Sequence, residues 1–280
     1  MRKRGRRPFR GLFLAVLSTG GLGAQQQPVN DRPPVEFKTL PNRFVRDEWR
    51  MWTSPFRINP QRTHTIKKYI IPFTLVSAAL IATDRYTGGL LPNTTDQAIW
   101  SGRVSQLGAW YSLAGLSGGT YLVGRLVDND HAKEAGLLGL EALGHAQLVV
   151  YAFKQATNRQ RPLDEDGKGS FWKGGTAFPS GHSASSFAVA TVFAYEYREH
   201  LAVPIVAYSL AAAISASRLS ARRHWVSDIV VGGSLGFLIG RFTYKRNHDP
   251  RLPGSPVRSA RRFIPQVGIS GPAVLLSWRL

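Results

Sequence analysis

Six apolar segments divide the central part of the chain. They span Tyr69–Thr83, Leu107–Val127, Ala135–Phe153, Ser183–Tyr197, Val203–Ala216 and Ile229–Phe242. Alanine, leucine and glycine predominate in them, and the alternation of apolar and polar positions that marks a half-buried strand is rare. The Asp and Asn residues before the third segment are typical of a helix N-terminus. The pattern predicts an all-α fold, a helical bundle of about six core helices.

The length of the segments leaves two kinds of bundle open. A helix needs about 20 apolar residues to cross a bilayer, and several of these segments are shorter. Glu141 and His145 interrupt the third segment and Glu196 interrupts the fourth, while the mean hydropathy of the chain is slightly negative. We favour a membrane-embedded bundle over a soluble one. Glu141 and His145 are four residues apart, and we interpret them as a buried pair that satisfies itself.

The segments outside the bundle are basic. Residues 1–24 hold six Lys and Arg and no acid. Within them, the basic start is followed by an apolar run and then by small residues, which predicts a signal peptide or an uncleaved N-terminal anchor. Residues 25–68 are polar and basic, and their Trp49, Trp52 and Phe56 indicate either a segment lying on a bilayer or a short helix packed on the domain. Residues 244–280 form a basic tail whose end has the alternation of a strand.

The net charge of the chain indicates which class of partner it binds. The chain has 36 Lys and Arg against 17 Asp and Glu, a formal net charge of +19. Such an excess favours anionic partners such as lipid headgroups, phosphates or nucleic acid. The absence of cysteine from the sequence excludes disulfides and thiolate metal sites.

Polar residues that can carry chemistry gather at four helix ends. They are Lys154 and Arg161 after the third segment, Ser180, Gly181 and His182 before the fourth, Arg218 after the fifth, and His224 and Asp228 before the sixth. Helices joined by short connections alternate in direction. The four ends should therefore lie on one face of the bundle.

This set of residues suits a tetrahedral oxyanion. Lys and Arg side chains supply charged donors, and the backbone N–H groups of Ser180 and Gly181 add a helix N-terminus. A histidine titrates near neutrality and can act as a nucleophile, and an Asp four residues later can orient its ring. A second histidine can protonate a leaving oxygen.

Three spaced motifs carry a family resemblance. Lys154-x6-Arg161-Pro162, Pro179-Ser180-Gly181-His182 and Ser217-Arg218-x5-His224-x3-Asp228 resemble the complete signature of the type 2 phosphatidic acid phosphatase superfamily. That superfamily includes membrane lipid phosphatases, bacterial class A acid phosphatases and vanadium haloperoxidases. With the flanking helices, the resemblance covers about residues 69–243, which we predict to be one helical domain.

The resemblance implies a role for each motif residue. His224 would be the nucleophile that forms a phosphohistidine, Asp228 would orient it, and His182 would be the general acid. The phosphoryl oxygens would bind to Lys154, Arg161, Ser180, Gly181 and Arg218. No metal and no other cofactor would be required, since the cations take the role that a metal would have.

The expected function is that of a metal-independent phosphohydrolase acting on a lipid phosphate at a membrane. We expect no nucleic-acid partner, and the sequence leaves the oligomeric state open. The alternatives are a soluble periplasmic acid phosphatase, a vanadate-dependent haloperoxidase and a non-catalytic phospholipid-binding protein. We expect the protein to be located in the bacterial cell envelope, either in the inner membrane with the active site facing the periplasm or in the periplasm itself. Basic segments at both ends of the bundle favour cytoplasmic ends with an outward site, whereas a cleaved signal favours a periplasmic protein.

Overall fold

The computed structural model describes residues 35–53, 66–90, 94–164, 168–252, 266–270 and 273–277 of the 280-residue chain. The predicted signal segment and Phe56 lie outside these residues. The elements in chain order are η1 (Phe37–Thr39), α1 (Leu40–Thr53), η3 (Ile66–Ile70), α3 (Ile71–Gly89), α4 (Thr95–Gln106), α5 (Trp110–Leu126), α6 (Asp130–Thr157), α7 (Gly181–Glu196), α8 (Ala202–Ser220), α9 (Val226–Asn247), β1 (Gln266–Ser270) and β2 (Ala273–Ser277).

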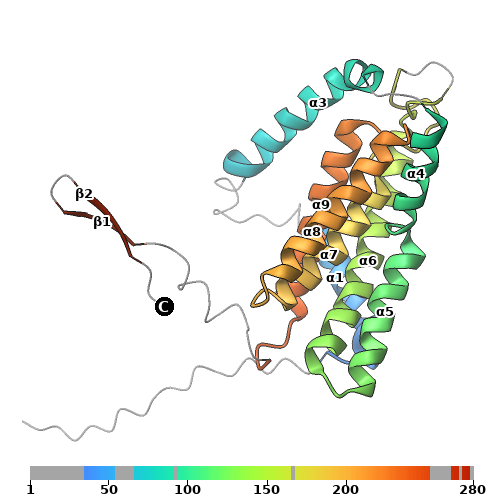
Figure 1. The fold of residues 1–280 in the computed structure, drawn as a ribbon. Helices are drawn as coiled ribbons and strands as arrows, with labels where there is room; N and C mark the ends of the chain where they lie inside the picture. Colours follow the sequence, from blue (N-terminus) through green and yellow to red (C-terminus); the bar gives the residue numbers. More distant parts are fainter. Residues whose placement is uncertain are drawn as a thin grey trace, which may run out of the picture. The chain divides into compact units, whose positions relative to one another are not determined.

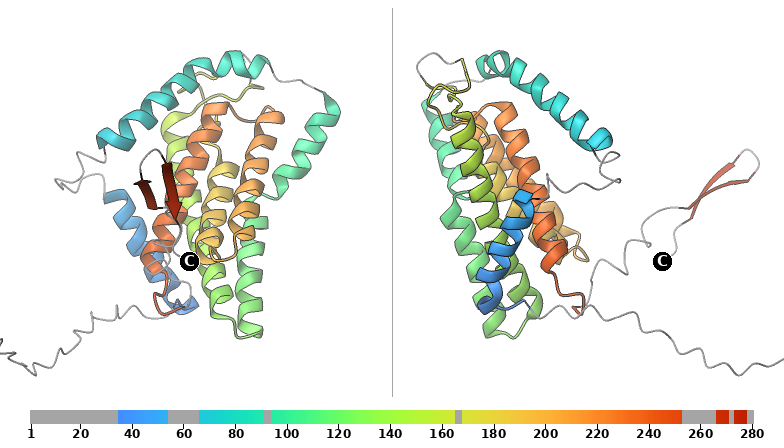
Figure 2. Two further views of the ribbon diagram at one scale, coloured as in Figure 1. Left: turned by 60° about the vertical axis from the view of Figure 1, so that its left-hand side comes forward. Right: turned by 180° about the vertical axis from the view of Figure 1, so that it is seen from behind.

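All six predicted segments are helical, and they correspond to α3 and α5–α9. Helices α5 to α9 lie side by side, and α7 contacts α5, α6, α8 and α9 (Figures 1 and 2). The strand pattern at the chain end is also present: β1 and β2 pair in antiparallel fashion, with Gln266 opposite Ser277. The prediction of an all-α bundle of about six core helices is confirmed, and α7 is its central helix.

Helix α4 was not among the predicted segments. Its sequence, TDQAIWSGRVSQ, has too few apolar residues for the pattern to stand out. Two hydrogen bonds attach it to the end of α8, from Gln97 Nε2 to the Ser220 carbonyl (2.9 Å) and between the hydroxyls of Ser101 and Ser220 (2.8 Å). Polar contacts rather than an apolar stripe therefore fix this helix.

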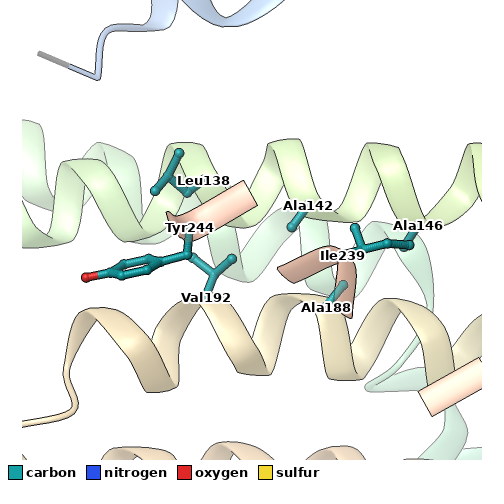
Figure 3. Close-up of a cluster of buried hydrophobic side chains, with 7 residues drawn as sticks. All are labelled: Leu138, Ala142, Ala146, Ala188, Val192, Ile239 and Tyr244. Atoms are coloured by element: carbon teal, nitrogen blue, oxygen red, sulfur yellow. The ribbon is translucent and has the colours of Figure 1, made fainter. Parts of the chain in front are cut away.

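The core between α6, α7 and α9 combines alanines with larger apolar side chains. Its buried members are Leu138, Ala142, Ala146, Ala188, Val192, Ile239 and Tyr244 (Figure 3). Glycines make the close packing of α9 on α7 possible: a Cβ added at Gly236 would lie 2.1 Å from the Ala184 carbonyl oxygen, and one at Gly232 would lie 2.5 Å from the Ser180 carbonyl oxygen. The same contact sets the start of α7 against the start of α9.

Helix α1 packs on α6 through polar groups. Arg43 Nη2 donates to Glu141 Oε2 (3.0 Å), and His145 Nδ1 lies 2.6 Å from Glu48 Oε1. His145 Nε2 is 3.8 Å from Glu141 Oε1. Glu141 and His145 are thus buried as predicted, but each takes a partner from α1 as well.

Some helices of the bundle are long enough to cross a membrane. Within the described ranges, α6, α8 and α9 are the three helices long and apolar enough to cross a membrane, by length and composition alone. Helix α7 has 16 residues and is surrounded by other helices. Helices α6 and α9 are therefore candidate spans that also contribute to the core.

Candidate active site

The ends of α6, α7 and α9 meet at one end of the bundle. The backbone N–H of Ser180 donates to the carbonyl of Asp228 (2.9 Å), which ties the start of α7 to the start of α9. A Cβ added at Gly181 would lie 3.9 Å from Lys154 Nζ, so the amine at the end of α6 approaches this helix start. The Ser180 side chain is fully buried and caps α7 by accepting from Ser183 N–H (3.5 Å).

His224 is buried in the loop between α8 and α9, with 2% of its surface exposed. Its Nδ1 lies 2.8 Å from the carbonyl oxygen of Ala177. A carbonyl only accepts hydrogen bonds, so Nδ1 carries the proton and Nε2 keeps its lone pair. Burial lowers the pKa of His224, against the opposing effect of the Asp228 carboxylate. The ring is therefore neutral at neutral pH, as a nucleophile must be.

Asp228 lies beside His224 but is not its closest partner. Asp228 Oδ2 is 3.5 Å from His224 Nδ1, further away than the Ala177 carbonyl. The same oxygen accepts from the Trp225 N–H (2.9 Å), and Oδ1 accepts from Arg159 Nη1 (2.6 Å). Asp228 thus fixes the turn that carries His224, and the carbonyl of a different loop sets the tautomer of its ring.

Arg159 is a residue of this site that the motif analysis missed. It is 1% exposed, and its guanidinium bridges Asp228 and Asp84, with Nη2 2.8 Å from Asp84 Oδ2. Asp84 also accepts from the backbone N–H of Ser227 (3.1 Å), at the first turn of α9. The Phe171 and Trp225 rings lie 4.7 and 5.6 Å from the guanidinium. In the sequence, Arg159 is one of six residues that separate Lys154 from Arg161, and no pattern marks it.

Two arginines line the mouth of the site with unpaired donors. Arg161 Nη2 donates to Thr176 Oγ1 (3.0 Å), and Arg218 Nη1 donates to Ser105 Oγ (3.1 Å). The Nε atoms of both are buried without a hydrogen-bond partner among the described residues. Both side chains border an open pocket of about 380 Å³. Buried charged donors of this kind are suited to an anion.

His182 is half-buried in the first turn of α7. Burial lowers the pKa of His182 to about 4, and four neighbouring groups add to the effect, namely Arg218, His224, Lys154 and Arg161. The predicted cations and histidines therefore act on one another electrostatically. A bound phosphate dianion would offset their charge and favour the protonated imidazole.

These residues lie within a part of the chain that is similar to known proteins. The model of the PAP2 superfamily matches residues 135–251, a range that contains all three motifs. The lipid A 1-phosphatase of Porphyromonas gingivalis is 35% identical over 111 residues, which cover 39% of this chain and 23% of that protein. The match thus spans about a quarter of that relative's length.

Two solved structures are similar to the bundle. The crystal structure of Aquifex aeolicus LpxE has 23% identity and a TM-score of 0.43, over 55% of this chain and 88% of the other. The transmembrane PAP2-type phosphatidylglycerolphosphate phosphatase of Bacillus subtilis has 21% identity and a TM-score of 0.47, over 63% and 94%. The match of the family model to residues 135–251, with all three motifs inside it, supports the resemblance of this part of the chain to the PAP2 superfamily.

Proposed function

We propose that the protein is a phosphohydrolase that removes a phosphate from a lipid phosphate through a phosphohistidine on His224, without a metal ion. The observation that carries the proposal is the buried, neutral His224, held through Nδ1 by the Ala177 carbonyl. Lys154, Arg161 and Arg218 supply positive charge at the same end of the bundle. A nucleophile surrounded by fixed cations is the arrangement that phosphoryl transfer requires.

The proposed reaction has two steps. In the first, the lone pair of His224 Nε2 attacks phosphorus, the bond to the lipid oxygen breaks, and His182 donates a proton to that oxygen. In the second, water attacks phosphorus, His182 takes a proton from the water, and the bond between phosphorus and His224 Nε2 breaks, which releases inorganic phosphate and restores the lone pair of Nε2. The cations stabilise the charge on the equatorial oxygens in both steps. They thereby take the part that a metal plays in other phosphatases.

Two observations support a lipid as the substrate. Helices α6, α8 and α9 are candidate membrane spans, which would bring the site to lipid headgroups. The Porphyromonas relative is named for the removal of a phosphate from a lipid. We propose a membrane location with the site on the periplasmic side. Among lipid phosphates, phosphatidate, phosphatidylglycerol phosphate, undecaprenyl diphosphate and lipid A phosphates are the substrates to compare.

The role of His182 is tested by varying the leaving group. A lipid alkoxide leaves poorly without a proton, whereas nitrophenolate leaves well without one. General acid catalysis is typically worth about 10²–10⁴-fold. His182→Ala should therefore lose most of this factor in the phosphorylation step with a lipid phosphate, and less with nitrophenyl phosphate. Burst kinetics isolate that step from hydrolysis of the phosphoenzyme. Equal losses with the two substrates would mean that His182 binds phosphate and does not donate a proton.

Metal independence and the phosphate site are tested together. Hydrolysis should continue in excess EDTA, because the cations of the site are side chains. Vanadate should inhibit, because it adopts the five-coordinate geometry of the phosphoryl transition state. Bromide oxidation measured in the same vanadate samples distinguishes a haloperoxidase. A strict requirement for Mg²⁺, or sustained bromide oxidation, would contradict the proposed reaction.

A further inference from the structure

A second group of buried ionisable side chains lies at the other end of the same helices. Glu134 is the fifth residue of α6, Glu196 is the last residue of α7, and His248 directly follows α9. The catalytic residues occupy the opposite ends of these three helices, near Lys154, His182 and Asp228. The same three helices thus bring ionisable side chains together twice, once at each end of the bundle.

The side chains of this group point their ligand atoms toward one another. One atom each from Glu134, Glu196 and His248 lies within 4.8 Å of the other two. His248 Nδ1 is 2.5 Å from Glu134 Oε1 and 3.7 Å from Glu196 Oε2. A second imidazole joins them, since His131 Nδ1 is 2.5 Å from Glu196 Oε1. Two carboxylates and the His248 imidazole therefore converge on one small volume, and His131 holds the Glu196 carboxylate through its other oxygen.

Hydrogen bonding within the group leaves one buried oxygen unsatisfied. The Glu196 side chain has 0% exposure, yet its Oε2 accepts no hydrogen bond from the described residues. That oxygen faces His248 Nδ1 at a distance too long for a hydrogen bond. An unpaired oxygen on a buried carboxylate is costly, and a cation is the partner that would remove the cost.

The surroundings hold the group in place. Glu134 accepts hydrogen bonds from the Asp249 N–H at both carboxylate oxygens (3.2 Å each). The Tyr244 ring stacks on His248 with 4.6 Å between ring centroids. Arg251 pairs with Asp249 at 2.7 Å. Outer contacts of this kind orient the ligands of metal sites.

We propose that Glu134, Glu196 and His248 bind a divalent transition-metal ion of the Zn²⁺ class, which joins the ends of α6, α7 and α9. One imidazole nitrogen and two carboxylate oxygens, completed by a water molecule, are a ligand set that Zn²⁺ accepts in a four-coordinate site. Zn²⁺ holds such ligands at about 2.0–2.2 Å, which separates neighbouring ligand atoms by about 3.4 Å. The His248–Glu134 pair must open by roughly 1 Å to admit the ion, a rotation of two side chains.

The ion would have a structural role, since it lies at the end of the bundle away from His224. The proposal is independent of the proposed phosphatase reaction. Removing the ion should lower thermal stability and leave hydrolysis at low temperature unchanged. Unchanged hydrolysis after removal of the ion would distinguish a structural ion from a catalytic one.

Metal content of the full-length protein in detergent micelles tests the site. After stripping with EDTA, dialysis against Zn²⁺ and removal of free ion, we expect one Zn²⁺ per chain by elemental analysis. Co²⁺ in its place should give the visible absorption of a four-coordinate ion. Added Zn²⁺ should raise the melting temperature of the stripped wild-type protein. Wild-type protein that retains no stoichiometric Zn²⁺ and shows no such rise would overturn the proposal without any variant.

Matched variants locate the bound ion. Glu196→Gln keeps the shape of the side chain and should lose the Zn²⁺ and the rise in melting temperature, as should His248→Ala. Glu199→Gln and His200→Ala change exposed residues in the turn that follows α7 and should keep both. His224→Ala should also keep the ion, which excludes binding at the catalytic end. Equal Zn²⁺ content in Glu196→Gln and Glu199→Gln would place the ion elsewhere and refute the site.

Discussion

Replacing His224 with alanine should reduce phosphate release by a factor on the order of 10⁴ or more, because the variant lacks the group that forms the covalent bond to phosphorus. Labelled substrate should leave no acid-labile phosphate on the variant, whereas the wild-type protein should be labelled when it is quenched in acid. The measurements are steady-state hydrolysis of a lipid phosphate and trapping of the phosphoenzyme.

Burial of His224 requires a second variant as a control for folding. His224→Ala leaves the Ala177 carbonyl without its donor and opens a cavity, so some stability is lost. His224→Asn can still donate to that carbonyl from its amide, and should be as inactive but more stable. His200→Ala removes an exposed imidazole and should have wild-type activity. Labelled phosphate trapped on either His224 variant would refute the assignment of the nucleophile.

Replacing Arg159 with methionine should have the largest effect on stability. The guanidinium of Arg159 is the cation that pairs with Asp84 and Asp228, both buried, and its removal leaves two buried carboxylates without their counter-ion. Breaking a buried ion pair by deleting one partner costs about 3–5 kcal/mol. For a chain of this size, that corresponds to a fall in melting temperature of roughly 10 °C. Thermal unfolding followed by circular dichroism measures it, with the exposed Arg125→Met as the matched control.

Activity of the same variant distinguishes a positioning role from a purely structural one. Asp228 holds the turn of His224 and is itself held by Arg159. Below its melting temperature, Arg159→Met should lose kcat on the order of 10²-fold, as a misplaced nucleophile does, with KM nearly unchanged. Adding Asp84→Asn removes one unpaired carboxylate and should recover part of the stability but little of kcat. Recovery of stability and kcat together would mean that Arg159 only stabilises the fold.

The sequence by itself determined the helices of the bundle and the motifs of the site. Periodicity and composition located α3 and α5–α9 because each helix carries a run of apolar residues that stands out along the chain. The spacing of the charged and histidine residues pointed to an anion site because alternating helices bring those ends to one face. The family match over residues 135–251 confirmed the resemblance that the motifs carry.

Only the tertiary structure decided which groups support the motif residues. The contact of His224 with the Ala177 carbonyl joins positions 47 residues apart, and the ion pair of Arg159 with Asp84 joins positions 75 residues apart. Neither contact leaves a local pattern in the sequence. Helix α4 gave no apolar stripe because polar bonds to Ser220 hold it. The meeting of Glu134, Glu196 and His248 depends on the lengths of three helices and on the glycines that let α9 approach α7. Sequence periodicity reports which face of a helix is buried, whereas the partner of a buried polar group is set by how the helices pack.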